Sequence, residues 1–376
     1  MANVVLGGGI GGLSAAYYLS KHAKNGIKLI EASDRVGGWI KTTKTQDGTI
    51  FEVGPRTLRV GDLASFNTLR LASDLKLESS VRPVLKSSEA ARTRMIYAQN
   101  RFCVLPNKLL DLFKVIPPFK LPLLFAVFAK DYFTPKKEAI DDSMYDFAAR
   151  RLGKDIADYL VSPMMCGIVA GDAKEISVKM LFDGMFKLEQ EYGSIAWGLI
   201  IKTLFKKKKE TTVSDIKSYS SELLFQSQEE RWSLWSLEGG LETLPKALNT
   251  YLKKETETEI CLNTECKKIE FNKDAVVLTL SDGKTHTAQT LYSSLPSRTL
   301  AQLLPNEHSF LKEELSAIPY VTVGVVNLAF DGNILPAEAF GYLIPPIEKE
   351  AVLGVTFDTC SFPQVIKFFF MHQYFI

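Results

Sequence analysis

The sequence predicts an α/β protein built around a parallel sheet, and three observations support this prediction. The apolar run at 4–6 enters a glycine cluster and continues at 14–20 as a helix-like segment. A second short apolar run lies at 26–33, and the segments 259–271 and 275–296 have the composition of strands joined by turns. With 376 residues, the chain is long enough for two or three domains.

The composition is that of a folded globular protein and excludes several classes of function. Hydrophobic residues make up 46% of the chain and charged residues 23%, while a net charge of +2 creates no field that would attract nucleic acid. The five cysteines are scattered without a Cys-x-x-Cys pair, so the sequence indicates neither a disulfide framework nor a zinc knuckle. The four histidines are not at ligand spacing, and we therefore expect no metal cofactor.

Gly7, Gly9 and Gly12 form the pattern Gly-x-Gly-x-x-Gly between the first apolar run and the helix-like segment. In a strand-turn-helix unit, the first glycine permits a tight turn, the second lets a pyrophosphate approach, and the third lets helix and strand pack closely. The free N–H groups of the helix N-terminus attract phosphate. The pattern alone also occurs in turns that bind no ligand, so its context decides the interpretation.

Glu31 supplies part of this context, because its carboxylate ends the second apolar run at the point where a strand would meet a ribose. An acid at this position favours a free 2′-hydroxyl over a 2′-phosphate. NADP is therefore disfavoured, while FAD and NAD both remain.

Two further turns follow Glu31 in order. The first, at 35–39, has a second glycine pair, and the second, at 54–57, begins with a stiff Gly-Pro step of a kind that can lie beside a flat ring. A plain turn explains each fragment alone, but the ordered series predicts one dinucleotide site. Its candidate residues are Gly7, Gly8, Gly9, Ile10, Gly11, Gly12, Glu31, Ala32, Arg35, Gly37, Gly38, Trp39, Gly54, Pro55, Arg56 and Thr57.

Longer stretches resemble the FAD-binding amine-oxidase-like superfamily and, within it, the animal enzymes that oxidise porphyrinogens. They are GGWIKT at 37–42, GPRTLR at 54–59, RWSLWSLEGGLETLPKAL at 231–248, AIPYVTVGVVNLAF at 317–330 and FGYLIPP at 340–346. This resemblance, which extends over residues 3–364, implies FAD as the cofactor. It also implies a Rossmann-like FAD-binding domain, a mixed-sheet substrate domain and a helical membrane-binding insertion.

The domain boundaries that follow from the resemblance divide the chain into five parts. They are a first part of the FAD domain at 1–87, the helical insertion at 88–205, a return to the FAD domain at 206–280, an incomplete substrate region with FAD-domain strands at 281–364, and a divergent tail at 365–376.

A membrane surface is an implied partner of the helical insertion. The apolar segment 119–133 is too short to span a bilayer and suits either the membrane surface or an ordinary core helix. The lysine run 206–209 suits either a solvated loop or contact with anionic lipid. The segment 322–330 is expected to be a buried strand.

The implied reaction is the six-electron oxidation of protoporphyrinogen IX to protoporphyrin IX in haem biosynthesis, with molecular oxygen as acceptor and hydrogen peroxide as product. The flavin carries the redox chemistry, and no side chain is identified as catalytic. The resemblance assigns the main chain near Cys266 to the adenine edge. It assigns substrate contacts to Arg94, Gly167, Ala170, Gly171, Phe340 and Gly341. Arg56 and Arg59 are expected to support the cofactor turn.

The resemblance also implies a homodimer at the mitochondrial inner membrane, facing the intermembrane space. It ends at residue 364, whereas the family continues with a segment that covers the flavin, so we expect an incomplete cofactor pocket and an unpaired sheet edge. The tail sequence is typical of a translated intron or a frameshift. Two alternatives therefore stay open: an inactive isoform that acts as a binding or dimer partner, and another FAD-dependent oxidase of the superfamily that acts on amines or carotenoids.

Overall fold

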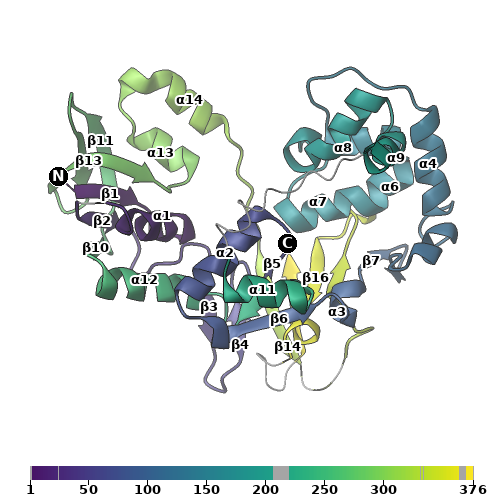
Figure 1. Cartoon of the computed structure of the whole chain (residues 1–376), viewed down its shortest axis with the longest axis horizontal. Helices are drawn as coiled ribbons and strands as arrows, with labels where there is room; N and C mark the ends of the chain where they lie inside the picture. The colour runs from purple at the N-terminus through teal and green to yellow at the C-terminus, as the bar shows by residue number, and fades with distance from the viewer. Residues whose placement is uncertain are drawn as a thin grey trace. The chain divides into compact units, whose positions relative to one another are not determined.

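The structure is a computed structural model that describes residues 2–23, 25–205, 220–330, 332, 334–363 and 370–375. The chain divides into two compact units, each made of discontinuous segments (Figure 1). The first unit comprises 1–83, 221–226 and 235–320, and the second comprises 84–220, 227–234 and 321–376.

The first unit contains a six-stranded sheet in the order β10-β2-β1-β13-β12-β11. The four strands from β10 to β13 in this order are parallel, and β12 and β11 continue the sheet antiparallel. Their bounds are β1 Ala2–Leu6, β2 Ile27–Ile30, β10 Thr258–Cys261, β11 Cys266–Phe271, β12 Val276–Leu280 and β13 Thr285–Ser293. The strands predicted at 4–6, 26–33, 259–271 and 275–296 are therefore confirmed.

Helices cover both faces of this sheet. On one face, Val5 and Leu29 pack with residues of α1 (Ile10–Ser20) and α12 (Thr243–Glu255). On the other face, Val4, Leu6 and Ile30 belong to a core that includes Leu300 and Leu303 of α13 (Ser297–Leu303). Because neighbouring residues of a strand point to opposite faces, this double cover explains why the first apolar run is continuous rather than alternating.

Several further elements lie wholly or partly in the first unit. Asp62 caps α2 (Leu63–Asp74) in a reciprocal arrangement with Ser65, in which each side chain accepts a hydrogen bond from the other residue's backbone N–H. The other elements are the hairpin of β3 (Thr42–Lys44) and β4 (Ile50–Glu52), η1 (Glu78–Ser80), η4 (Asn306–His308) and α14 (Ser309–Ala317). A three-stranded sheet has the order β5-β9-β6, with β5 Leu58–Arg59, β9 Trp232–Leu237 and β6 Val81–Leu85, and α11 spans Glu222–Glu229.

The second unit combines a helical region with a mixed sheet. Its helices are α3 Glu89–Arg92, η2 Leu109–Phe113, α4 Leu123–Phe133, α5 Met144–Arg151, α6 Lys154–Ile156, η3 Ala157–Val161, α7 Ser162–Val169, α8 Val178–Tyr192, α9 Ile195–Phe205, η5 Pro346–Glu348 and α15 Asp358–Ser361. Phe147, Met165, Val178 and Phe186 form the centre of the helical core. No helix among the described residues is both long enough and apolar enough to cross a bilayer.

The sheet of the second unit has the order β14-β17-β16-β15-β7-β8. Its strands are β7 Met95–Ala98, β8 Arg101–Val104, β14 Val325–Phe330, β15 Gly341–Leu343, β16 Gly354–Phe357 and β17 Phe370–Phe375. Strand β17 comes from the divergent tail and pairs antiparallel with both β14 and β16. The backbone of the tail therefore completes this sheet.

The expectation that the segment 322–330 is a buried strand is wrong in part. Strand β14 forms within it, but none of its residues is buried, and Val326 is 40% exposed. The physical reason is its position, because β14 is the outer strand of the sheet and pairs with β17 on one side. An outer strand keeps the same apolar composition while part of its surface faces solvent.

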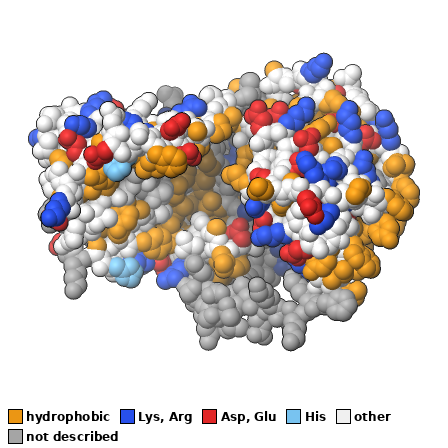
Figure 2. Space-filling model, turned by 90° about the horizontal axis from the view of Figure 1, so that it is seen from above, with side chains coloured by type: hydrophobic (Ala, Val, Ile, Leu, Met, Phe, Trp, Pro, Cys, Tyr) orange, Lys and Arg blue, Asp and Glu red, His pale blue; other side chains and the backbone are white. Residues whose placement is uncertain are grey.

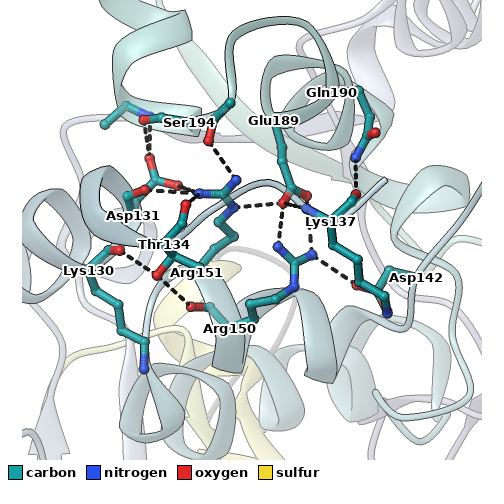
Figure 3. A network of polar contacts seen from close by, with 12 residues as sticks. Lys130, Asp131, Thr134, Lys137, Asp142, Arg150, Arg151, Glu189, Gln190 and Ser194 are labelled. Carbon is teal, nitrogen blue, oxygen red and sulfur yellow. Dashed lines mark hydrogen bonds and ion pairs between the residues drawn. The ribbon is translucent and has the colours of Figure 1, made fainter. Parts of the chain in front are cut away.

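A buried ion network joins the helix ends of the second unit (Figure 3). The Arg151 side chain of α5 is fully buried, and its Nε donates to Glu189 of α8 at 2.8 Å. Its Nη1 lies 3.3 Å from a carboxylate oxygen of Asp131, which is also fully buried. Its other donors bond the backbone oxygens of Asp131, Thr134 and Gly193. One guanidinium therefore holds the ends of α4 and α8 together.

Candidate cofactor and substrate sites

The glycine turn after β1 depends on contacts that exclude larger residues. Gly7 has a φ of +97°, a value that favours glycine. A Cβ on Gly12 would lie 1.8 Å from the carbonyl oxygen of Gly7. Helix α1 can therefore approach the end of β1 this closely only because the residue at position 12 has no side chain. The N-terminus of α1 then begins directly after Gly9. This is a cradle of bare backbone and free N–H groups, which suits a pyrophosphate.

The second glycine turn lies against the first, backbone to backbone. The N–H of Gly37 donates to the carbonyl oxygen of Gly8 at 2.8 Å. A Cβ on Gly38, whose φ is +57°, would lie 3.1 Å from the Cα of Gly9. The Arg35 guanidinium stabilises this turn from inside, because it donates to the carbonyl oxygens of Val36, Ile40 and Gly38. The two predicted turns are therefore in direct contact.

Glu31 occupies the end of β2 beside the glycine turn. One of its carboxylate oxygens accepts a hydrogen bond from the Gly8 N–H at 2.6 Å, and the other accepts bonds from the N–H and hydroxyl of Ser33 at 2.9 and 2.6 Å. Burial alone would raise the pKa of this carboxyl, but these hydrogen bonds and the charge of Arg35 hold its pKa below the usual value. Glu31 is therefore an ionised acceptor, as hydrogen bonding to ribose hydroxyls requires.

The Gly54-Pro55 turn also approaches the second glycine turn. A Cβ on Gly54 would lie 2.0 Å from the carbonyl oxygen of Trp39. The Trp39 side chain itself is 79% exposed and leaves its ring open to a ligand. Arg56 is buried, and its carbonyl oxygen accepts a bond from the Ser236 hydroxyl at 2.8 Å. The backbone of Arg56 thus holds this segment to β9.

Cys266 is the first residue of β11. The loop that precedes it contacts the residues that follow β2. The N–H groups of Asn263 and Thr264 donate to the carbonyl oxygens of Ser33 and Glu31 at 2.8 and 2.9 Å. The Cys266 side chain is buried, and burial raises the pKa of its thiol. The loop brings main chain rather than a reactive thiolate to this edge of the site.

Ser294 is a site residue that the sequence reasoning missed. Its hydroxyl lies 2.9 Å from the Leu6 carbonyl oxygen and 3.2 Å from that of Gly7, and it therefore fastens the first glycine turn to the end of β13. A serine after a strand carries no distinctive sequence signal, and its contact spans 287 residues. Only the parallel pairing of β1 with β13 brings Ser294 to the turn.

The predicted substrate residues all lie in the second unit, and two of them are in contact. The Arg94 guanidinium carbon lies 4.8 Å from the centre of the Phe340 ring, which is a cation–π distance. The same side chain donates to the Ala90 carbonyl oxygen at 2.8 Å. An aromatic ring and a backbone oxygen thus orient the planar cation.

The other four predicted substrate residues have local structural roles. A Cβ on Gly167 would lie 2.7 Å from the Leu343 side chain, and one on Gly341, at a φ of +145°, would lie 2.0 Å from the Val355 carbonyl oxygen. Ala170 ends α7 in a left-handed conformation, and Gly171 follows it. Gly167 thus lies against β15, the strand that begins directly after Phe340.

The chain belongs to the flavin-containing amine oxidoreductase family, whose model matches residues 10–364. FAD is therefore its cofactor, and the choice between FAD and NAD is resolved in favour of the flavin. The glycine cradle and the ionised Glu31 fit this group, because they match a pyrophosphate and a ribose with a free 2′-hydroxyl. Among the residues that the structure describes, no group of three His, Cys, Asp or Glu side chains could hold a metal ion.

The curated relatives of this chain include several protoporphyrinogen oxidases, and a coproporphyrinogen III oxidase of Bacillus subtilis matches at 27% identity. The protoporphyrinogen oxidases of Bos taurus and Homo sapiens are both 37% identical to this chain over 362 residues, which are 96% of this chain and 73% of each relative. The protoporphyrinogen oxidase of Schizosaccharomyces pombe is 32% identical over 96% of this chain and 75% of its own length.

Solved structures support the fold. A crystal structure from Exiguobacterium sp. 255-15 has a TM-score of 0.76 at 21% identity and covers 100% of this chain and 76% of its own. An oxidoreductase from Methanosarcina mazei has a TM-score of 0.63 at 16% identity, and the alignment covers 100% of this chain and 78% of the oxidoreductase. The α/β fold with mixed sheets that the sequence predicted is thus shared with known proteins.

Proposed function

We propose that this chain catalyses the FAD-dependent oxidation of protoporphyrinogen IX to protoporphyrin IX by molecular oxygen, a step of haem biosynthesis. The observation that carries the substrate assignment is the Arg94 guanidinium held over Phe340, in a chain that is 32–37% identical to the protoporphyrinogen oxidases of Bos taurus, Homo sapiens and Schizosaccharomyces pombe. The substrate is a large apolar macrocycle with two propionates, and an oriented guanidinium matches a carboxylate in charge and geometry.

Bound FAD supplies the redox chemistry, in that it accepts the hydrogens of the substrate and returns the electrons to oxygen. The full reaction removes six hydrogens from the porphyrinogen and reduces three molecules of oxygen to three of hydrogen peroxide. The chain's own residues bind and orient. Arg94 would hold one propionate through paired hydrogen bonds, and the Phe340 ring would fix the plane of its guanidinium.

Replacement of Arg94 tests this proposal. Loss of a charge-assisted hydrogen bond costs about 1.5–3 kcal/mol, so R94A should raise the KM for protoporphyrinogen about tenfold or more and change kcat less. Arg92 is an exposed arginine two residues earlier, and R92A is the matched control. An unchanged KM in R94A would remove the propionate assignment. If the FAD-loaded wild-type chain forms no porphyrin, the proposed function itself is refuted.

We also propose that the helical region of the second unit binds a membrane surface. Figure 2 shows hydrophobic side chains gathered at the right-hand end of the view, over the part of this unit where Figure 1 places α4. The exposed apolar residues of η2 and α4 include Leu109, Leu110, Phe113, Phe125, Tyr132 and Phe133. Exposed lysines flank them at 108, 114, 120 and 130 and suit anionic headgroups. The lysine run 206–209 lies outside the described residues.

Vesicle flotation tests the membrane proposal. Burial of a leucine side chain contributes about 1.5–3 kcal/mol, so serine at both Leu109 and Leu110 should weaken binding to phosphatidylcholine–phosphatidylserine vesicles at least tenfold. Phe310 of the first unit is as exposed as Leu109, at 76%, and F310S is the control. Equal flotation of all three proteins would contradict the proposal.

A homodimer and a location on the mitochondrial inner membrane, facing the intermembrane space, remain proposals supported by the resemblance. Sedimentation equilibrium and fractionation of mitochondria with protease protection test them. A monomer at all concentrations would refute the first proposal, and a soluble matrix protein would refute the second.

A further inference from the structure

Two buried glutamates outside the predicted site hold the loop before α12 against the second glycine turn. Glu52 and Glu242 are each only 7% exposed. Glu52 ends β4, and Glu242 directly precedes α12, so they lie 190 residues apart in the chain. Buried carboxylates are costly unless they are paired or hydrogen-bonded, and their partners therefore indicate what they stabilise.

Glu52 fastens the loop to the β3–β4 hairpin. One of its carboxylate oxygens accepts the Leu241 N–H at 2.6 Å, and the other accepts the Thr42 hydroxyl at 2.8 Å. Gly240 makes this approach possible, since its φ is +91° and a Cβ there would lie 2.4 Å from the Thr42 side chain. The Thr42 hydroxyl oxygen also accepts the Glu242 N–H at 3.2 Å. The hairpin thereby fixes the backbone that carries Glu242.

Glu242 in turn reaches the second glycine turn. One carboxylate oxygen lies 3.4 Å from Nη1 of Arg35, and the other lies 3.4 Å from the Thr42 N–H and 2.9 Å from the Lys246 ammonium. The Arg35 guanidinium also donates hydrogen bonds to neutral carbonyl oxygens of the turn. The charge of Glu31 also acts on Arg35, but among the described residues Glu242 is the carboxylate in direct contact with this guanidinium.

We propose that Glu242 is a positioning residue for FAD, which acts through Arg35 to hold Gly37 and Gly38 against Gly8. Without this carboxylate, the partly buried Arg35 guanidinium loses its ion-pair contact, and the turn leaves the cradle geometry more often. The apparent FAD affinity falls in proportion to the fraction of molecules that keep the geometry. This inference rests on the FAD site and is independent of the porphyrinogen assignment.

Titration of the 376-residue apoprotein with FAD, followed by quenching of flavin fluorescence, tests the inference. E242A is expected to raise the Kd for FAD at least tenfold. E242Q keeps an acceptor for the Thr42 N–H but loses the charge, so it should raise the Kd by an intermediate factor. K246A removes the exposed ion partner of the same carboxylate and is the matched control, with a Kd within twofold of wild type.

A double-mutant cycle with R35A separates positioning from a merely structural role. If Glu242 acts through Arg35, then R35A/E242A should bind FAD within twofold of R35A alone. Independent losses that multiply would overturn the inference, as would an unchanged Kd in both Glu242 variants. If E242A does not fold, the isosteric E242Q provides the measurement and the second arm of the cycle.

The outcomes also distinguish this inference from the proposed function. A wild-type chain that binds no FAD overturns the cradle and the role of Glu242 with it. A chain that binds FAD but oxidises no porphyrinogen refutes the proposed function and leaves the Kd comparison intact.

Discussion

Alanine at two adjacent glycines of the first turn should have opposite effects on stability. A Cβ on Gly12 would lie 1.8 Å from the Gly7 carbonyl oxygen and 2.7 Å from the Ser294 hydroxyl oxygen. Since a backbone oxygen cannot rotate away, α1 must move from β1, and overpacking of this kind costs about 1–3 kcal/mol. On Gly11, which is exposed, the nearest atom would be the Ser294 Cβ at an ordinary 3.5 Å.

The Gly11 substitution should therefore be neutral or stabilising. Alanine inside a helix is favoured over glycine by about 0.5–1 kcal/mol, and nothing near Gly11 opposes it. Urea unfolding of the two apoproteins measures the difference, and FAD titration adds a second readout. G12A should also lower the FAD affinity at least tenfold, because displacement of α1 opens the cradle. Equal stability of G11A and G12A, with equal FAD affinity, would refute the argument that close approach explains the third glycine.

Two further predictions concern charge. R151M leaves the fully buried carboxylate of Asp131 without its cation and Glu189 with Arg150 alone, and it should reduce the free energy of unfolding by about 3–5 kcal/mol, whereas K187A, at an exposed ion pair, should leave the melting temperature close to that of wild type. Similar melting temperatures of the two variants would contradict this. The pKa of Glu31 in the folded protein is held below its usual value of 4.5, so the ionised carboxylate stabilises the folded state. This contribution to the free energy of unfolding is fully present above pH 4.5 and is lost as the pH falls through the lowered pKa. The stability advantage of wild type over E31Q should thus be constant above pH 4.5 and shrink below it, and an advantage that grows on acidification would reverse the assigned sign.

Local signals explain what the sequence revealed about the cofactor site. The run from β1 through Gly12 to Glu31 is one continuous strand-turn-helix-strand unit, in which the positive φ of Gly7 and the close approach of Gly12 to the Gly7 carbonyl oxygen require glycine. Such backbone requirements restrict residue type strongly, so they are legible in a single sequence.

Long-range pairing explains what the sequence did not reveal. Ser294 and Glu242 reach the same site only because β13 and α12 return to it, and neither residue type is unusual where it stands. The Arg151 network is similar, since its carboxylates come from two other helices. The burial of β14 was overestimated because apolar composition cannot distinguish an inner strand from an outer one. The pairing of β17 with β14 and β16 could not be predicted, because no sequence motif in the tail indicates which strands it joins.

Anaerobic addition of protoporphyrinogen IX to the purified, FAD-loaded 376-residue chain tests the central claim most directly. The account predicts that the visible absorbance of the flavin bleaches at once, and that oxygen then restores it with release of fluorescent porphyrin and hydrogen peroxide. A flavin that stays oxidised in the presence of the porphyrinogen would contradict the account.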